Sequence, residues 1–147
     1  MNEQSRPYFR ILAGYYGVLQ TCHLLSLARA GWILLQGRGV PFPASPPPGG
    51  WTESALPFLL GMGLVDVFAI GLGLIFVYRF FFHQEFRLVI GLISLTIAVV
   101  SGVVYLVGTI PSGAWGANPW EYLAVLVLFA PAVPLYLSLL KQRFDLR

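Results

Sequence analysis

Hydrophobic residues fill four long stretches of the chain, and most charged residues lie outside these stretches. The stretches run over residues 11–35, 54–78, 88–110 and 122–140. A bilayer core about 30 Å thick takes roughly 20 helical residues at ~1.5 Å each, so every stretch is long enough to cross it. The runs are apolar on all sides, unlike amphipathic surface helices or the short alternating strands of membrane barrels. The pattern therefore predicts four transmembrane helices.

We predict an all-α integral membrane protein, a four-transmembrane-helix antiparallel bundle that forms one membrane domain over residues 1–147. The helices are expected at about 9–36, 54–79, 86–110 and 119–141, with an outer loop at 37–53. This loop holds five prolines and four glycines between Gly37 and Trp51. Such a composition favours polyproline II or irregular backbone, which cannot cross lipid.

The composition agrees with a membrane protein, and the charges predict its orientation. Hydrophobic residues make up 57% of the chain and charged residues only 10%. Seven basic residues flank one side of the predicted helices: Arg6, Arg10, Arg79, Arg87, Lys141, Arg143 and Arg147. Only Arg38 lies in a loop on the other side. The positive-inside rule then places the N and C termini in the cytoplasm, in a multi-pass protein of a cell membrane of cytoplasmic type.

A cleavable signal peptide is the main alternative for the first helix. A basic start, an apolar run and the small-residue pattern Ala28-Arg29-Ala30 resemble its three regions. Cleavage there would leave three helices. The run is interrupted by His23 and continues through Trp32, so we expect the first helix to be retained.

The fourth helix carries signals for its start and for a bend. Asn118 is expected to be the N-cap residue, Pro119 the first helical residue and Glu121 the partner that returns a bond to the cap. Pro131 and Pro134 fall in the helix interior, where proline bends a helix.

The polar residues of the first helix share one face. Seven residues fall within an arc of about 120°: Tyr15, Leu19, Cys22, His23, Ser26, Arg29 and Ala30. Gln20 lies just beyond the edge of this face. Because polar side chains are costly in lipid, we expect this face to look into the bundle. The second helix carries one charge, Asp66, roughly 15 Å from its outer end, between the depths of Arg29 (about 9 Å) and His23 (about 18 Å).

Asp66 has two candidate partners. An isolated charge at mid-membrane costs about 3 to more than 10 kcal/mol, so this carboxylate must be paired, hydrated or protonated. Arg29 is the favoured partner, because a guanidinium stays charged and binds carboxylate through two donors. That pair would be a structural clip between helices. Alternatively, Asp66 and His23 form a titratable pair of the kind that moves protons or coupled substrates.

The third helix has no charge but carries small and hydroxyl residues at spacings of three and four: Gly91, Ser94, Ala98, Ser101, Gly102, Tyr105, Gly108 and Thr109. This stripe is typical of close helix packing in membranes. Residues that could line a polar path near the Asp66, Arg29 and His23 cluster are Gln20, Ser26, Ser94, Ser101 and Tyr105.

The sequence offers little for catalysis. No paired carboxylates, metal-binding spacing or phosphate loop is present, so we predict no catalytic residue, no metal site and no cofactor, and lean against an enzyme. The basic residues form no patch for nucleic acid.

The expected partners are the lipid bilayer and a protein partner or a second copy that contacts the helix faces. The favoured function is an accessory or interaction subunit of a membrane assembly; the alternative is a small transporter or membrane ligand-binding protein that uses Asp66, His23 and Arg29.

Overall fold

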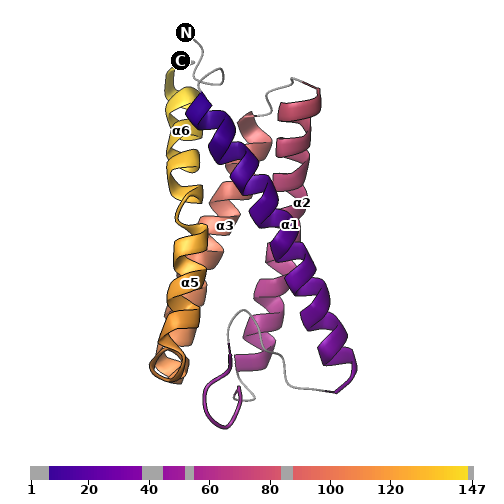
Figure 1. Cartoon of the computed structure of the whole chain (residues 1–147), viewed down its shortest axis with the longest axis vertical. Helices are drawn as coiled ribbons and strands as arrows, with labels where there is room; N and C mark the ends of the chain where they lie inside the picture. The colour runs from indigo at the N-terminus through magenta and orange to yellow at the C-terminus, as the bar shows by residue number, and fades with distance from the viewer. Residues whose placement is uncertain (1–6, 38–44, 52–54, 84–87, 146–147) are drawn as a thin grey trace.

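The computed structural model describes residues 7–37, 45–51, 55–83 and 88–145. Every regular element in these ranges is helical, and four long apolar helices pack as a bundle (Figure 1), which confirms the predicted all-α class. The four spans have mean hydropathies of 1.3, 2.3, 2.4 and 2.3. By helix length and composition, the chain is therefore a four-span membrane protein.

The first three spans are single helices. They are α1 (Pro7–Leu35), α2 (Ala55–Phe82) and α3 (Leu88–Thr109). α1 has 29 residues, and at ~1.5 Å per residue it is longer than the ~30 Å hydrocarbon core of a bilayer. Figure 1 shows it running diagonally across the bundle. A tilt of this kind lets a long helix fit a thinner bilayer.

The fourth span is broken in the middle. It consists of α5 (Pro119–Phe129) and α6 (Ala132–Asp145), which are separated by a turn that contains Pro131 (Figure 1). Proline has no backbone N–H and its ring clashes with the preceding turn, so the break follows from the sequence. The hydroxyl of Tyr15 on α1 donates to the Leu128 carbonyl at 2.8 Å. This bond satisfies one of the carbonyls that the end of α5 leaves without a helical partner.

Two short elements join α3 to α5. They are the 3-10 turn η2 (Ile110–Ser112) and the single-turn helix α4 (Ala114–Ala117). Gly113 between them has a φ of 77°, a left-handed conformation that glycine adopts without steric cost. Trp115 Nε1 donates to Thr109 Oγ1 at 3.0 Å and ties the turn back to α3. The hydrophobic pattern predicts neither element, because one turn is too short to show a period.

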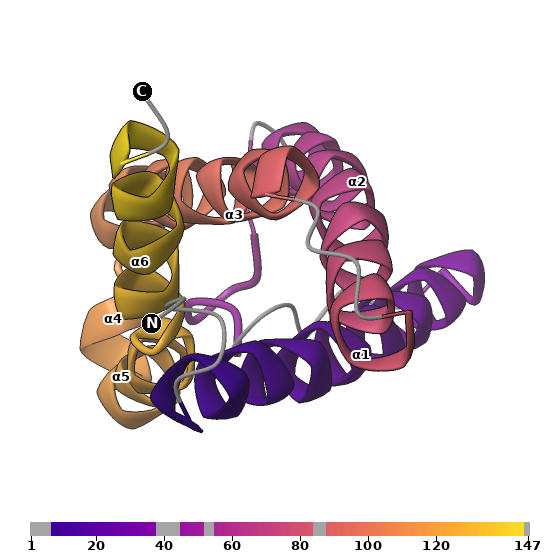
Figure 2. The ribbon, with the colours of Figure 1, turned by 90° about the horizontal axis from the view of Figure 1, so that it is seen from above.

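The spans form four sides around a centre, with α1 opposite α3 and α2 opposite α5 and α6 (Figure 2). Pro7 and Asp145 lie at one end of the bundle, which we call the terminal end (Figure 1). Residues 45–51, η2 and α4 lie at the other end, which we call the loop end.

Two clusters of buried side chains hold the bundle together. The larger cluster, toward the terminal end, comprises Phe9, Ala13, Tyr16, Leu19, Phe76, Leu95, Ala132, Leu135 and Leu139. The smaller cluster, at the loop end, comprises Leu59, Tyr105, Ala114 and Tyr122. α2 and α3 contribute side chains to both clusters, and residues between the two clusters on these helices line the space that separates them.

The predicted stripe of α3 is buried along most of its length. Its buried members are Gly91, Ser94, Ser101, Tyr105 and Thr109, whereas Gly102 and Gly108 are exposed. A Cβ atom added at Gly91 would lie 2.9 Å from ring carbons of Phe76 on α2 and 3.0 Å from Leu139 Cδ1 on α6. Glycine at this position therefore allows three helices to meet closely.

The predicted capping box of α5 is wrong. Asn118 is the N-cap residue and Pro119 follows it, but the Asn118 side chain makes no capping hydrogen bond. Its Nδ2 donates instead to the Ser45 and Pro46 carbonyls, both at 3.3 Å. The Glu121 carboxylate accepts hydrogen bonds from the Ser45 N–H at 2.7 Å and from the Ser45 hydroxyl at 3.1 Å. The two side chains fasten the loop to the loop end of the bundle, a long-range contact that competes with local capping.

Candidate functional site

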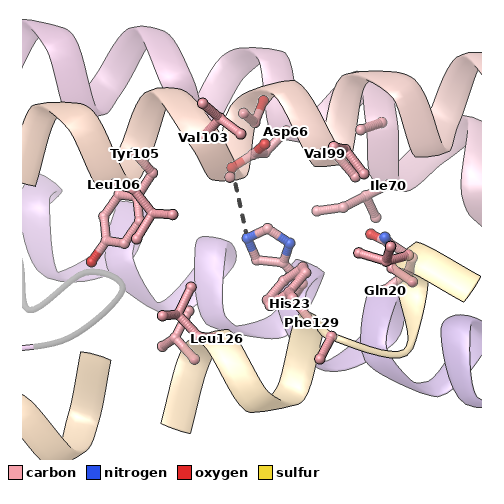
Figure 3. Close-up of a pocket in the computed structure, with 18 residues that line it drawn as sticks. Gln20, His23, Asp66, Ile70, Val99, Val103, Tyr105, Leu106, Leu126 and Phe129 are labelled. Atoms are coloured by element: carbon pink, nitrogen blue, oxygen red, sulfur yellow. Dashed lines mark ion pairs between the residues drawn. The ribbon is translucent and has the colours of Figure 1, made fainter. Parts of the chain in front are cut away.

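A cavity of about 260 Å³ lies inside the bundle (Figure 3). Residues of α1, α2, α3, α5 and α6 line it, and most of them are apolar. Its larger polar side chains are Gln20 and His23 on α1, Asp66 on α2, and Ser101 and Tyr105 on α3. A few polar groups in a mostly apolar hollow are the usual composition of a small-molecule site. We call this hollow the central cavity.

His23 and Asp66 face each other inside the central cavity (Figure 3). His23 Nε2 lies 3.8 Å from Asp66 Oδ2, and the Ser101 hydroxyl interacts with the same carboxylate from α3. This separation lies within ion-pair range but beyond hydrogen-bond range. The side chains remain 16% and 13% exposed, so atoms of both are accessible from the space that they line.

α1 packs against α2 near glycines on both sides of the carboxylate. A Cβ atom added at Gly73 would lie 3.0 Å from a ring carbon of Tyr16, and one added at Gly63 would lie 3.7 Å from Leu27 Cδ2. Gly63 and Gly73 lie three residues before and seven residues after Asp66, on one face of the helix. The contact between α1 and α2 therefore continues past the carboxylate on both sides.

One buried polar atom near the central cavity, Gln20 Oε1, has no hydrogen-bond partner among the described residues. The Tyr105 hydroxyl interacts with the Tyr122 hydroxyl. Figure 3 shows Gln20 and Tyr105 on opposite sides of the His23–Asp66 pair. A buried acceptor without a partner is costly unless another molecule supplies one, so Gln20 Oε1 is a candidate contact for a ligand.

The Arg29 side chain does not pair with the Asp66 carboxylate in the structure. Within the described ranges the ion pair of Asp66 is with His23, and Arg29 is exposed and lines a different hollow. This second hollow has a volume of about 370 Å³ and lies between α1 and α5. Its walls include Leu19, Cys22, His23, Ser26, Arg29, Ala30 and Ile33 on α1, and Val125, Leu128 and Phe129 on α5. We call it the α1–α5 groove.

The expectation that the whole polar face of α1 looks into the bundle is wrong for its second half. Cys22, Ser26 and Arg29 are exposed, whereas Gln20, predicted just beyond the edge of that face, is 1% exposed. The physical reason is the diagonal course of α1, which carries its loop-end half past α2 (Figure 2).

The other predicted lining residues have separate places. Ser101 and Tyr105 line the central cavity, and Ser26 lines the α1–α5 groove while it donates to the Cys22 carbonyl at 3.0 Å. Ser94 lines neither hollow: its hydroxyl donates to the Ala69 carbonyl on α2 at 2.7 Å. A role of these residues in binding or transport stays a prediction.

The sequence pattern misses Phe129. This ring lies edge-on to the His23 imidazole, with centroids 5.5 Å apart and planes at 84°, and it lines both hollows. A phenylalanine in an apolar span carries no distinguishing signal of its own. Its position just before the Pro131 break was the only available indication, because the end of a helix can turn a side chain toward the interior.

The side chains that line the central cavity offer several hydrogen-bonding groups. Among the described residues, no group of three or more His, Cys, Asp or Glu side chains lies close enough to hold a metal ion. The residues that are present offer one carboxylate, one imidazole, one amide and two hydroxyl groups in a mostly apolar hollow. Groups of these types can form hydrogen bonds with a small polar molecule, and carboxyl and imidazole groups can exchange protons.

Comparisons of the chain with protein-family models, with curated proteins and with solved structures gave no match in any of the three.

Proposed function

We propose that the protein binds a small, mostly apolar molecule with a cationic or hydrogen-bond-donating head, as a membrane ligand-binding protein or small transporter. The observation that carries the proposal is the Asp66 carboxylate, which lies beside His23 in the mostly apolar central cavity between the candidate membrane spans. Carboxylates in such positions are rare and commonly mark a substrate or ion pathway.

The chemistry of the lining favours a donor over an acceptor as the ligand's head. An ionised Asp66 only accepts hydrogen bonds, and Gln20 Oε1 is an acceptor without a partner among the described residues. A protonated primary amine can pair with the Asp66 carboxylate and can also donate a hydrogen bond to Gln20 Oε1, because it carries a positive charge and several N–H donors. The volume of about 260 Å³ falls just below the ~300 Å³ lower limit of common ligand pockets, which favours a small ligand.

The orientation in the membrane is part of this proposal. The charge distribution supports a cytoplasmic terminal end in a cytoplasmic-type cell membrane. Trp32, Trp115 and Trp120 lie toward the loop end of their elements, where amphipathic rings sit at the opposite headgroup layer. Protease treatment of sealed vesicles that carry a C-terminal tag tests the orientation: a tag protected inside inverted vesicles, with their cytoplasmic side outward, would contradict it.

A function as an accessory or interaction subunit stays a prediction. Many large apolar side chains are exposed along the spans, including Phe68, Val107 and Val127. Contact with lipid requires the same exposure, so it does not favour a protein partner.

A thermal-shift titration of the detergent-purified protein tests the binding proposal. The probe is n-hexylamine, and hexanoate of matched chain length is the comparison ligand. We expect hexylamine to raise the melting temperature of the wild type, and hexanoate to have no such effect, because the cavity offers a carboxylate. The variant Asp66→Asn should lose the shift.

Two control variants, Glu121→Gln and Ala124→Leu, distinguish binding in the central cavity from effects of hexylamine or of the substitution elsewhere on the protein. Glu121→Gln makes the same acid-to-amide change at the loop end and should keep the hexylamine shift. Ala98→Leu fills the central cavity and should abolish the shift, whereas Ala124→Leu on the exposed side of α5 should retain it. Equal hexylamine shifts in the wild type and in Asp66→Asn would overturn the proposal.

A further inference from the structure

The position of Arg29 in the first span makes an anionic partner favourable for its positive charge. It is part of the first span, six residues before Leu35, or about 9 Å along the helix from its loop end. Its side chain is exposed, and among the described residues no carboxylate lies within ion-pair distance of it. A guanidinium at this depth is costly in hydrocarbon unless it reaches a counter-charge.

The hollow next to Arg29 has the shape and surface for a hydrocarbon chain. The α1–α5 groove has a volume of about 370 Å³, and its apolar walls are formed by side chains such as Leu19, Ile33 and Val125. Leu19 and Arg29 are ten residues apart, which corresponds to about 15 Å of helix. That length equals half of the ~30 Å core of a bilayer, or one leaflet.

A hydrogen bond joins α1 to α5 at the end of the groove that lies toward the terminal end. Tyr15, one turn before Leu19, donates its hydroxyl hydrogen bond to the Leu128 carbonyl at 2.8 Å and so joins α1 to α5. Beyond this bond, α6 rather than α5 packs against α1. A chain entering beside Arg29 therefore meets a stop near the middle of the span.

We propose that the α1–α5 groove binds one anionic phospholipid of the surrounding bilayer, with its phosphate on Arg29 and an acyl chain along the groove. The planar guanidinium binds a phosphate through two parallel hydrogen bonds. The described lining contains no carboxylate that could pair with the ammonium group of a zwitterionic headgroup. The groove therefore favours a headgroup with net negative charge.

This site is separate from the ligand site of the central cavity. His23, Val125 and Phe129 line both hollows, but Arg29 and Ser26 line only the groove. The lipid proposal therefore does not depend on hexylamine binding, and either proposal can fail alone.

Native mass spectrometry of the full chain in mild detergent tests the proposal. The probes are palmitoyl-oleoyl phosphatidylglycerol, phosphatidylcholine with the same acyl chains, and oleate. We expect one phosphatidylglycerol to bind the wild type about tenfold more tightly than phosphatidylcholine, the ratio that one charge-assisted contact supplies. Arg29→Gln should remove this preference, Arg29→Lys should retain part of it, and Arg143→Gln, which neutralises an exposed cation at the terminal end, should leave it unchanged.

A second variant tests the acyl chain without touching the charge. Ala30→Leu narrows the groove and should weaken binding of both phospholipids several-fold, while the preference for phosphatidylglycerol remains. Equal affinity of the wild type for the two phospholipids would overturn the proposal, as would unchanged binding in Ala30→Leu. Displacement of phosphatidylglycerol by equimolar oleate would also overturn it, and would assign the groove to a fatty acid.

Discussion

At the scale of single residues, Ser94 joins three helices through one hydroxyl group. Its hydroxyl donates to the Ala69 carbonyl on α2 at 2.7 Å, and Tyr16 on α1 shares a hydrogen bond of 2.7 Å with the same oxygen. A serine hydroxyl has a single hydrogen, so Tyr16 must be the donor in the second bond. Ser94 is 0% exposed and Tyr16 1% exposed, so neither bond can be replaced by water.

The variant Ser94→Ala should therefore destabilise the bundle. It leaves the Tyr16 hydroxyl buried without its acceptor, and we expect the free energy of unfolding to fall by about 1–2 kcal/mol. Unfolding in mixed micelles with increasing dodecyl sulfate, followed by tryptophan fluorescence, gives this value.

Ser138→Ala is the matched control, because the Ser138 hydroxyl donates to the Pro134 carbonyl of its own helix, at 2.8 Å. This substitution should change the free energy of unfolding by no more than about 0.5 kcal/mol. Equal losses in the two variants would show that the three-helix bond contributes nothing of its own.

At the scale of helices, packing of α3 against α2 and α6 depends on where glycine is required. Gly91 faces the buried ring of Phe76 and the buried side chain of Leu139, both 0% exposed. Gly102, on the same helix, has no neighbouring atom within 4 Å of an added Cβ. The two glycines therefore have different physical roles although the sequence stripe treats them alike.

A pair of alanine substitutions tests this difference. Gly91→Ala forces Phe76 or Leu139 to move within a filled core and should destabilise the protein by about 1–3 kcal/mol. Gly102→Ala meets open space and should be neutral or stabilising by up to about 1 kcal/mol, because alanine is the better helix former. The same micelle titration measures both variants. A destabilising effect at Gly102 equal to that at Gly91 would contradict the packing described here.

The long helices could be predicted from sequence, because an apolar run of more than 20 residues has few other folded states in lipid. A bend near Pro131 was also predictable, since proline removes a backbone donor, but the single helix expected at 119–141 is broken there into α5 and α6. The side-chain partners of Glu121 were not, because local spacing suggested a cap while the actual donor, Ser45, lies 76 residues away. Contacts between distant segments leave no periodic signal in one sequence.

At the scale of the whole molecule, the central cavity lies between the two clusters of buried side chains, one toward each end of the bundle. α6 packs against α3 and α1, whereas α5 has its main contact with α4 (Figure 1). The break at Pro131 separates α6 from α5. The central cavity and the α1–α5 groove both lie next to this break. One proline thus positions two candidate binding sites.

The sequence limited the partners of Asp66 to two cations but could not choose between them. Arg29 was favoured on chemistry, since its charge is permanent. Helix depth alone placed Asp66 between Arg29 and His23. The diagonal path of α1 decides the geometry in favour of His23, and a crossing angle cannot be derived from the residues of one helix.

A double-mutant cycle between His23 and Asp66 tests the central claim most directly. The free energies of unfolding of His23→Gln, Asp66→Asn and the double variant are measured in the same micelles, beside an equivalent cycle of Arg29→Gln with Asp66→Asn. We predict a coupling energy above about 0.5 kcal/mol for His23 with Asp66, and additive effects within roughly that value for Arg29 with Asp66. Additive effects in the first cycle and coupling in the second would contradict the account, because Asp66 would then depend on Arg29 and not on His23.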